Sequence, residues 1–210
     1  MKLIAPNLYS MGVQHTSAVV QLHLNSFQGF FLSFLGPSFL TIYYAALCKA
    51  SEGIAIVYCN DNGIPAGFVV GSSNPRGFYS RLLKREWLRF AIASVGAMVR
   101  KPNIIVRLAR AVSHPGNNPV GEDVAGLFSV GVQPDFQGCG IGKQLISAFL
   151  EEAAKRGCRR VFLTTDRDNN DAVNIFYQRC GFAIERQYET PEGRRMNEYW
   201  ISINDEMNKV

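Results

Sequence analysis

Long apolar runs, clustered cysteines and a secretory leader are all missing from this sequence. The longest apolar stretch worth testing, residues 90–99, is ten residues long, and a membrane-spanning helix needs about 20. Met1 and Lys2 are followed by Pro6 and Asn7, which interrupt the apolar region that a secretory signal requires. We therefore expect a protein that neither spans a membrane nor is secreted.

The cysteine content argues against a disulfide framework. The 5 cysteines are odd in number, lie far apart and lack the spacing of metal ligands. Because reduced thiols are typical of the cytoplasm, we expect a cytoplasmic location and no bound metal. The 3 histidines form no pattern, and we interpret each as structural or solvated.

Charged residues are also scarce, at 19% of the chain against 47% apolar residues. This balance is typical of a folded globule and not of a disordered segment. A length of 210 residues suffices for one well-buried α/β domain, or for one domain with an insertion. We expect residues 1–210 to form a single domain, since the sequence contains no internal repeat.

A glycine-rich turn stands out at residues 130–143, which read V-G-V-Q-P-D-F-Q-G-C-G-I-G-K. Apolar residues recur after it at helical spacing, at Ile141, Leu145, Ile146, Phe149 and Ala153. Gly138, Gly140 and Gly142 would bring backbone N–H groups to the start of this helix, where an anion is attracted. Gly140 and Gly142 lack a Cβ, so a pyrophosphate could approach the backbone closely. The pattern therefore predicts a phosphate-binding turn.

Two familiar phosphate-binding motifs do not fit this turn. A P-loop requires Ser or Thr after its lysine, but Lys143 is followed by Gln144. A dinucleotide motif G-x-G-x-x-G that begins at Gly138 would need a glycine where Lys143 stands. Both nucleotide-binding classes are therefore excluded for this segment.

The turn resembles the acetyl-CoA motif of the GNAT N-acetyltransferases, Q/R-x-x-G-x-G/A, which Gln137, Gly140 and Gly142 match. A second match lies at residues 163–182, where a strand, a polar loop and a helix end in Cys180-Gly181-Phe182. The resemblance covers about residues 122–203 and is closest to the branch that acetylates protein N-termini. It implies an acetyl-CoA-dependent N-acetyltransferase.

The fold implied by this resemblance is α/β (α+β), a single GNAT-type domain. Its central sheet is mixed, mostly antiparallel, with splayed strands flanked by helices. The first half agrees in element order: a strand at residues 9–14, a helix at 17–31, a helix from Pro37 and a hairpin of residues 54–58 and 64–71.

The resemblance also implies which residues contact acetyl-CoA, the co-substrate. Strand residues Val130, Gly131 and Val132 would pair with pantetheine through backbone groups that a splayed neighbour leaves free. The pyrophosphate would meet the turn, and Asn170 would be the CoA-contacting asparagine. The turn residues concerned are Gln137, Gly138, Cys139, Gly140, Ile141, Gly142 and Lys143. Cys139 is interpreted as incidental to the chemistry.

Tyr177 is the candidate general acid, beside the thioester sulfur by the same resemblance. A phenol with a pKa of about 10 can protonate a thiolate with a pKa of about 8.5 when the two are in contact. Glu122 and Asp123 are candidate bases, and Asp166 is a further carboxylate near the next strand. Gly126 and Thr165 occupy the positions at which relatives carry a base. A weak base favours an amine of low pKa, such as an α-amine or an amino sugar.

A basic helical insertion is predicted at residues 77–112, ahead of the fourth strand, as two helices broken at Lys101-Pro102. It holds eight cations against Glu86, a net charge of +7 in a chain of net +5. The cations are Arg81, Lys84, Arg85, Arg89, Arg100, Lys101, Arg107 and Arg110. An opposite stripe holds Tyr79, Leu83, Trp87, Phe90 and Ser94.

Several roles for the insertion stay open: a packed structural pair, a collar for an anionic acceptor, a membrane-surface contact or a contact with an acidic partner. Nucleic acid is not expected, because the cations belong to no binding module. The acceptor is a small-molecule or peptide amine, including a nucleotide-linked amino sugar. A non-catalytic acyl-CoA sensor, a peripheral membrane protein and a homodimer remain alternatives.

Overall fold

The computed structural model describes residues 2–27, 31–100, 121 and 123–203. Their strands form one sheet of 8 strands in the order β1-β2-β3-β4-β5-β6-β8-β7. Every neighbouring pair is antiparallel except β5 and β6. The strands are β1 (Leu3–Ala5), β2 (Leu8–Ser10), β3 (Gly53–Cys59), β4 (Pro65–Ser72), β5 (Val124–Val132), β6 (Arg160–Asp166), β7 (Ala183–Glu189) and β8 (Arg195–Ser202). The mixed, mostly antiparallel sheet is as predicted.

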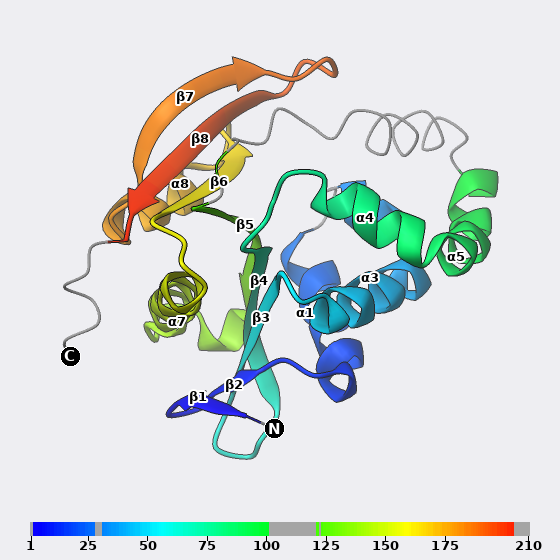
Figure 1. Ribbon diagram of the computed structural model, residues 1–210, viewed down its shortest axis with the longest axis horizontal. Coiled ribbons are helices and arrows are strands. Elements are labelled where there is room, and N and C mark those ends of the chain that lie inside the picture. Colours follow the sequence, from blue (N-terminus) through cyan, green and yellow to red (C-terminus); the bar gives the residue numbers. More distant parts are fainter. Residues whose placement is uncertain (1, 28–30, 101–120, 122, 204–210) are drawn as a thin grey trace.

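Helices cover both faces of this sheet (Figure 1). On one face lie α1 (Thr16–Ser26), α3 (Pro37–Lys49) and α4 (Phe78–Arg85), with α5 (Trp87–Arg100) at the outer end of the layer. On the other face lie α7 (Ile141–Lys155) and α8 (Asp171–Arg179). Short turns complete the order: η1 (Val13–His15), α2 (Phe31–Phe34) and η2 (Pro134–Phe136). Each helical layer encloses its own apolar cluster against the sheet.

Strands β5 and β6 diverge, as predicted. Their pairing ends at Gly126 opposite Phe162, whereas β6 continues along β8 as far as Asp166 opposite Met196. Strand β5 meanwhile stays paired with β4 up to Val132. A bulge interrupts that ladder at Phe128, because Val70 and Gly71 pair with the residues on either side of it. The sheet is therefore open on one side of β5 beyond Gly126.

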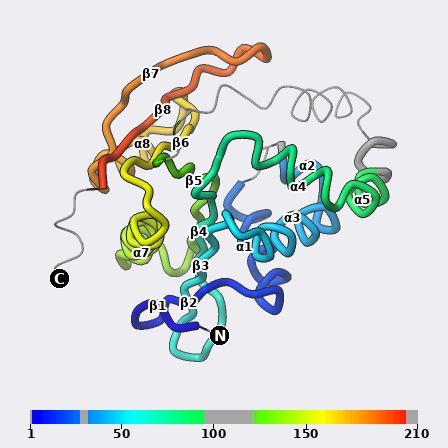
Figure 2. Tube along the Cα trace, in the orientation of Figure 1, coloured from blue at the N-terminus to red at the C-terminus, as the bar shows by residue number. Residues whose placement is uncertain are grey.

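The sequence placed several first-half elements correctly. Pro37 is the first residue of α3, whose Leu40, Tyr44 and Leu47 are fully buried as expected. The predicted hairpin is β3 and β4, and the trace in Figure 2 follows it from the α1 and α3 layer into α4. The basic insertion thus leaves the sheet directly from β4.

Two predicted boundaries near the N-terminus are wrong. The strand expected at residues 9–14 ends at Ser10, because Gly12 donates its N–H to His15 Nδ1 and starts the η1 turn. The helix expected to reach residue 31 ends at Ser26. Ser33 Oγ donates a hydrogen bond to the Phe27 carbonyl at 2.6 Å, which redirects the chain. Strand β1 was not predicted.

The insertion has a break that was not predicted. Glu86, with φ −119° and ψ 25°, separates α4 from α5, whereas the predicted break at Lys101-Pro102 lies outside the described part of the chain. The predicted stripe is correct for Phe90 and Ser94, which are buried. It is wrong for Trp87, the first residue of α5, whose side chain is 65% exposed although it lies on the same helix as Phe90 and Ser94.

Candidate active site

The divergence of β5 from β6 creates the main opening in the sheet. From Leu127 onwards, the backbone groups of β5 that point toward β6 have no strand partner among the described residues. Unpaired strand groups readily bond to an extended ligand. Val130 and Val132 pack toward the α7 side, while Gly131 faces the Phe68 ring, which would lie 2.9 Å from a Cβ at this position. These three residues form the rim of the opening.

The glycine-rich turn leads from β5 into α7. Gly138 and Gly140 adopt the left-handed conformation, with φ 78° and 79°, which residues with a side chain rarely adopt. Gly140 is the N-cap of α7 and has no side chain to cap the N–H groups that follow. The first backbone N–H of α7 that bonds within the helix is that of Gln144, which donates to the Gly140 carbonyl. The first turn of α7 therefore presents N–H donors and a positive dipole end to an anion.

The helix itself is the one predicted. Its inward face is buried along its whole length and packs on β3, β4 and β5. The buried residues include Ile141, Leu145, Ile146, Phe149 and Ala153. This packing holds the turn in a defined place beside the opening.

The two glycines expected to make room for a pyrophosphate have different roles. No atom lies within 4 Å of a Cβ built on Gly140, so the space in front of this residue is open. A Cβ on Gly142 would lie 3.1 Å from the Phe176 ring of α8. The missing side chain of Gly142 therefore also permits α7 and Phe176 of α8 to pack closely, and its place beside a pyrophosphate stays a prediction.

The remaining turn residues shape the loop. Gln137 donates from Nε2 to the Val132 carbonyl at 3.2 Å, which ties the turn to the end of β5. The exposed Cys139 thiol lies 3.8 Å from the Gln137 carbonyl, and Lys143 is exposed on α7. The glutamine of the motif therefore supports the turn, and Lys143 is the one cation in its first helical turn.

Tyr177 is buried on α8, with 7% of its surface exposed. Its ring packs against Phe176, Phe182 and Tyr199 at centroid distances of 5.4, 6.0 and 5.9 Å. Burial raises the pKa of the phenol well above its usual range, and nearby Cys180 adds to this effect. The hydroxyl group therefore keeps its proton at neutral pH.

Asn170 begins α8 and closes the loop after β6. Its Nδ2 donates to Thr165 Oγ1 at 2.9 Å and to the Asp166 carbonyl at 3.0 Å. Asn174, one turn later, bonds to the same Asp166 carbonyl and accepts hydrogen bonds from Asn197 and Tyr199 on β8. This buried network orients α8 and hence Tyr177. Sequence reasoning missed it, although the i, i+4 spacing of Asn170 and Asn174 was visible.

The candidate bases are not gathered at the opening. Asp123 lies before the paired end of β5, about 13 Å along the strand from Leu127, the first unpaired residue. Asp166 is held by Arg194 through both carboxylate oxygens at 2.7 Å. Glu122 lies outside the described residues.

A second buried polar group lies on the other face of the sheet. His23 Nδ1 and the Tyr44 hydroxyl are 2.7 Å apart, and both side chains are almost fully buried among aromatic rings. Burial lowers the pKa of His23 to about 4. The bulge residue Phe128 joins this aromatic layer through Phe78 and Tyr79. His23 is thus a neutral structural residue, one of the two roles that the sequence suggested for each histidine.

The described residues contain no group of His, Cys, Asp and Glu side chains placed to hold a metal ion. None of the helices in the described ranges combines the length and apolar character needed to cross a membrane.

Comparison with known proteins gives a family match. The pattern of the Acetyltransferase (GNAT) family matches residues 20–182, a range that contains β5, the glycine turn, α7 and α8.

Individual relatives match over shorter stretches. Mycothiol acetyltransferase of Cellulomonas flavigena is 42% identical over 74 residues, which are 33% of this chain and 21% of that protein. An uncharacterized N-acetyltransferase of Methanocaldococcus jannaschii is 45% identical over 140 residues, 67% of this chain and 43% of that protein. The ribosomal protein bS18 alanine N-acetyltransferase of Escherichia coli is 37% identical over 76 residues, 34% and 51% of the two chains. The matches thus span between about a fifth and about half of these relatives.

Solved structures share the fold at low sequence identity. The ribosomal-protein-S18-alanine N-acetyltransferase from Escherichia coli aligns with a TM-score of 0.57 at 17% identity, over 94% of this chain and 93% of that one. Ard1 from Thermoplasma volcanium aligns with a TM-score of 0.60 at 15% identity, over 94% and 97%. The acetyltransferase yncA from Salmonella typhimurium, solved with acetyl-CoA, aligns at 0.59 and 13% identity, over 94% of both chains.

Proposed function

The chain belongs to the acetyltransferase (GNAT) family, and on this premise we propose that it is an acetyl-CoA-dependent N-acetyltransferase acting on a primary amine by direct attack. The observation that carries the proposal is the position of the uncapped first turn of α7 beside the open edge of β5. A diphosphate and an extended chain of amide groups need these two surfaces next to each other.

The described residues fit the co-substrate. The N–H groups that follow Gly140 would bind the diphosphate, and the open space in front of this glycine leaves room for it. Val130 would pair its backbone groups, and Val132 its N–H, with the pantetheine amides, since the Val132 carbonyl already accepts a hydrogen bond from Gln137. Asn170, at the start of α8, would lie along the same ligand. Bound acetyl-CoA would supply an acetyl group activated as a thioester.

Tyr177 is proposed to be the general acid. Its raised pKa keeps the phenol protonated, and also makes it a weaker acid than a free phenol, so proton transfer to the thiolate requires that the two groups be held within hydrogen-bond distance. The ring contacts with Phe182 and Tyr199 limit the movement of the hydroxyl group. A positioned acid of this kind typically contributes 10²-fold to 10⁴-fold to the rate.

The acceptor amine is proposed to have a low pKa. Asp166 is paired with Arg194, and Asp123 is distant along β5 from the opening. Neither of these candidate carboxylates is therefore free at the opening. An α-amine with a pKa near 8 is partly neutral at pH 7 without help, whereas a lysine amine near 10.4 is not. An N-terminal peptide amine and an amino sugar both meet this condition.

An acceptor screen tests the proposal. The protein is incubated with acetyl-CoA and candidate amines, and free thiol release is followed with a chromogenic disulfide. The set includes N-terminal peptides, nucleotide-linked amino sugars and peptides whose only amine is a lysine. We expect turnover with an amine of the first two classes and little with lysine. Tight binding of acetyl-CoA in calorimetry without turnover on any amine would instead support a non-catalytic acyl-CoA sensor.

A further inference from the structure

The outer face of α5 exposes large apolar side chains. Trp87 is 65% exposed, Leu88 55% and Ile92 68%. The inner face of the same helix is already occupied, since Phe90 is 3% exposed and packs on Phe39 of α3 at 4.7 Å. Helix α5 is thus apolar on two sides, of which the protein covers one.

Helical geometry places two of the exposed residues in line. Leu88 and Ile92 lie one turn apart, whereas Trp87 lies about 100° and 140° from them around the helix and about 60° from Phe90, by the rotation of 100° per residue. Phe90 lies about 180° from the line between Leu88 and Ile92. Three large apolar side chains are thus exposed within the first two turns of α5, which indicates a binding surface.

Exposed cations lie within a few residues of Trp87 and Leu88 in the chain, and Glu86, the acid among them, pairs with Arg89. Lys84, Arg85 and Arg89 are exposed, and Glu86 lies 3.4 Å from Arg89. No other carboxylate of the described residues lies within ion-pair distance of Lys84 or Arg85. We define the α5 face as Lys84, Arg85, Trp87, Leu88, Arg89 and Ile92. Its charge is complementary to an anionic surface.

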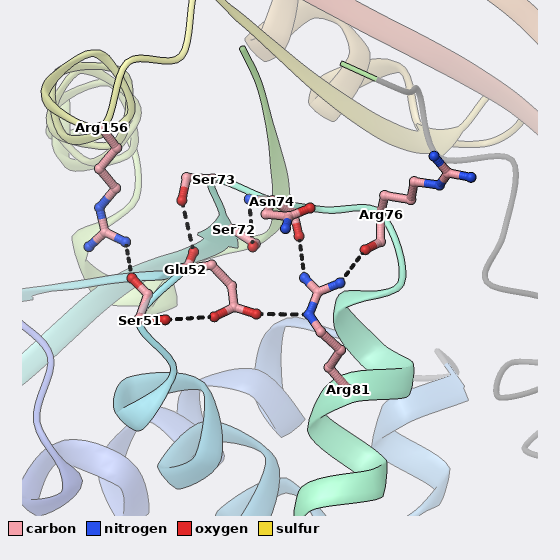
Figure 3. Close-up of polar contacts among 8 residues, drawn as sticks. All are labelled: Ser51, Glu52, Ser72, Ser73, Asn74, Arg76, Arg81 and Arg156. Carbon is pink, nitrogen blue, oxygen red and sulfur yellow. Dashed lines mark hydrogen bonds and ion pairs between the residues drawn. The ribbon is translucent and has the colours of Figure 1, made fainter. Parts of the chain in front are cut away.

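Arg81 does not belong to this face, because it is turned back into the protein (Figure 3). Its Nε donates to Glu52 at 2.9 Å, and its other nitrogens donate to the carbonyls of Asn74 and Arg76. On the far side of the sheet, Arg156, which follows α7, donates to the Ser51 carbonyl next to Glu52. The network fixes the base of α4 and leaves the α5 face to solvent.

We propose that the α5 face binds an anionic lipid surface, with α5 lying in the plane of the headgroups. Trp, Leu and Ile flanked by Lys and Arg are the composition of helices that lie in this plane. The apolar side chains would enter the acyl boundary while the three cations contact lipid phosphates. A second copy of the chain fits less well, because a symmetric contact would bring two sets of cations together.

The position of the face is compatible with the proposed enzyme activity. Helices α5 and α7 lie on opposite sides of the sheet (Figure 1). Docking through α5 would therefore leave the first turn of α7 open to acetyl-CoA from solution. This inference does not depend on the acetyltransferase proposal, since vesicle binding is measured without a substrate.

The sequence offers a built-in probe, because the chain has 2 tryptophans and one of them is Trp87. Trp200 is 8% exposed, so Trp200→Phe leaves Trp87 as the single fluorophore. Vesicles of phosphatidylcholine alone and mixed with phosphatidylglycerol are titrated into this variant. We expect a blue shift and protection from acrylamide with the anionic vesicles only, and weaker binding as the salt concentration rises. Flotation of the wild-type chain with the same vesicles checks the result without substitution.

Two sets of variants separate the contributions. In flotation, the combined change Lys84→Gln, Arg85→Gln and Arg89→Gln should lower partitioning about fivefold for each cation. The combined change Trp87→Ser, Leu88→Ser and Ile92→Ser should lower it at least tenfold, on the order of what three apolar side chains contribute. A control that removes the same charge from exposed sites elsewhere, with Lys49→Gln, Lys155→Gln and Arg159→Gln, should have a much smaller effect.

Three results would overturn the proposal. One is the failure of the wild-type chain to bind anionic vesicles. Another is binding that the charge variant and its control weaken equally. The third is a dimer in sedimentation velocity, without vesicle binding, that the apolar variant converts to a monomer, since the face would then contact a second copy. Circular dichroism and acetyl-CoA titration confirm that each variant is folded.

Discussion

The two helical layers on the sheet are held in place by different kinds of interaction. Helix α7 begins where two glycines adopt φ values near 80°, and its regular apolar face packs on the strands beside it. The insertion helix α4 is anchored by Arg81, which joins Glu52 and two backbone carbonyls from separate parts of the chain. The start of α7 thus depends on local backbone conformation, whereas the position of α4 depends on Glu52, 29 positions earlier in the chain.

The same contrast applies to the polar groups that each layer buries. The α1 and α3 layer encloses His23, whose charged form is disfavoured, whereas the α7 and α8 layer encloses Tyr177, whose neutral form persists to high pH. Acid should therefore loosen the first layer before the second. One sheet therefore separates a pH-sensitive structural core from the proposed catalytic core.

The largest effect is expected from acidification of the α1 and α3 layer. Burial lowers the pKa of His23 to about 4 in the folded state, from an ordinary value of about 6.5. Its contribution to the stability of the folded state is therefore fully present above pH 6.5 and is lost as the pH falls toward 4. We expect this residue to remove on the order of 3 kcal/mol of unfolding free energy over that interval. Urea titrations at several pH values measure it.

His23→Gln is the matched variant for this experiment. It removes the titrating group, so its stability should depend less on pH between 6.5 and 4 than that of the wild-type chain. Parallel pH profiles for the two proteins would show that the acid sensitivity comes from other groups.

The next effect concerns the proposed acid. Tyr177→Phe keeps the ring contacts and loses the proton, so kcat should fall by roughly 10² while acetyl-CoA affinity barely changes. The assay is steady-state turnover with the best acceptor from the screen. Wild-type turnover, measured where chemistry limits the rate, would leave Tyr177 with a packing role only.

The third effect isolates the turn at the start of α7. Gly140→Val should weaken CoA binding tenfold or more, about 1.4 kcal/mol, because the new side chain fills the space in front of the donors and opposes a φ of 79°. Gly157→Val is the control, since Gly157 has a φ of 82° and open space at the other end of α7. Both variants carry similar strain. Calorimetry that finds equal CoA affinities for the two would remove the phosphate-binding assignment.

The smallest effect tests the anchor of the insertion. Arg81→Gln should lower the unfolding free energy by about 1 kcal/mol or less, since the ion pair with Glu52 is partly exposed. Arg85→Gln, on the same helix, should leave the melting temperature unchanged. If Arg85→Gln lowered the melting temperature more than Arg81→Gln, Arg81 would not be the anchor of α4.

Local patterns predicted the elements that depend on local geometry. The apolar spacing of α7, the proline at the start of α3 and the hairpin turn of β3 and β4 all concern residues within a few positions of one another. The candidate turn residues were predicted on the same local basis. The end of α1 was missed because it depends on Ser33 bonding back to the Phe27 carbonyl.

Other parts of the site could not be read from spacing. The role of Gly142 depends on the Phe176 ring from α8, 34 positions further along the chain. Asn174 meets Asn197 and Tyr199 only because β8 pairs with β6. The neutralisation of Asp166 requires Arg194, which the β7 and β8 hairpin brings back beside it.

By itself the sequence determined the family, the glycine turn and the helix that follows it, because backbone conformation and helical period act over neighbouring residues. Only the tertiary structure decided which cations of the insertion are free. Arg81 is used by Glu52, whereas Lys84 and Arg85 remain beside the exposed Trp87, Leu88 and Ile92. Net charge is a sum over residues, but the charge that a partner meets depends on which side chains folding has already paired.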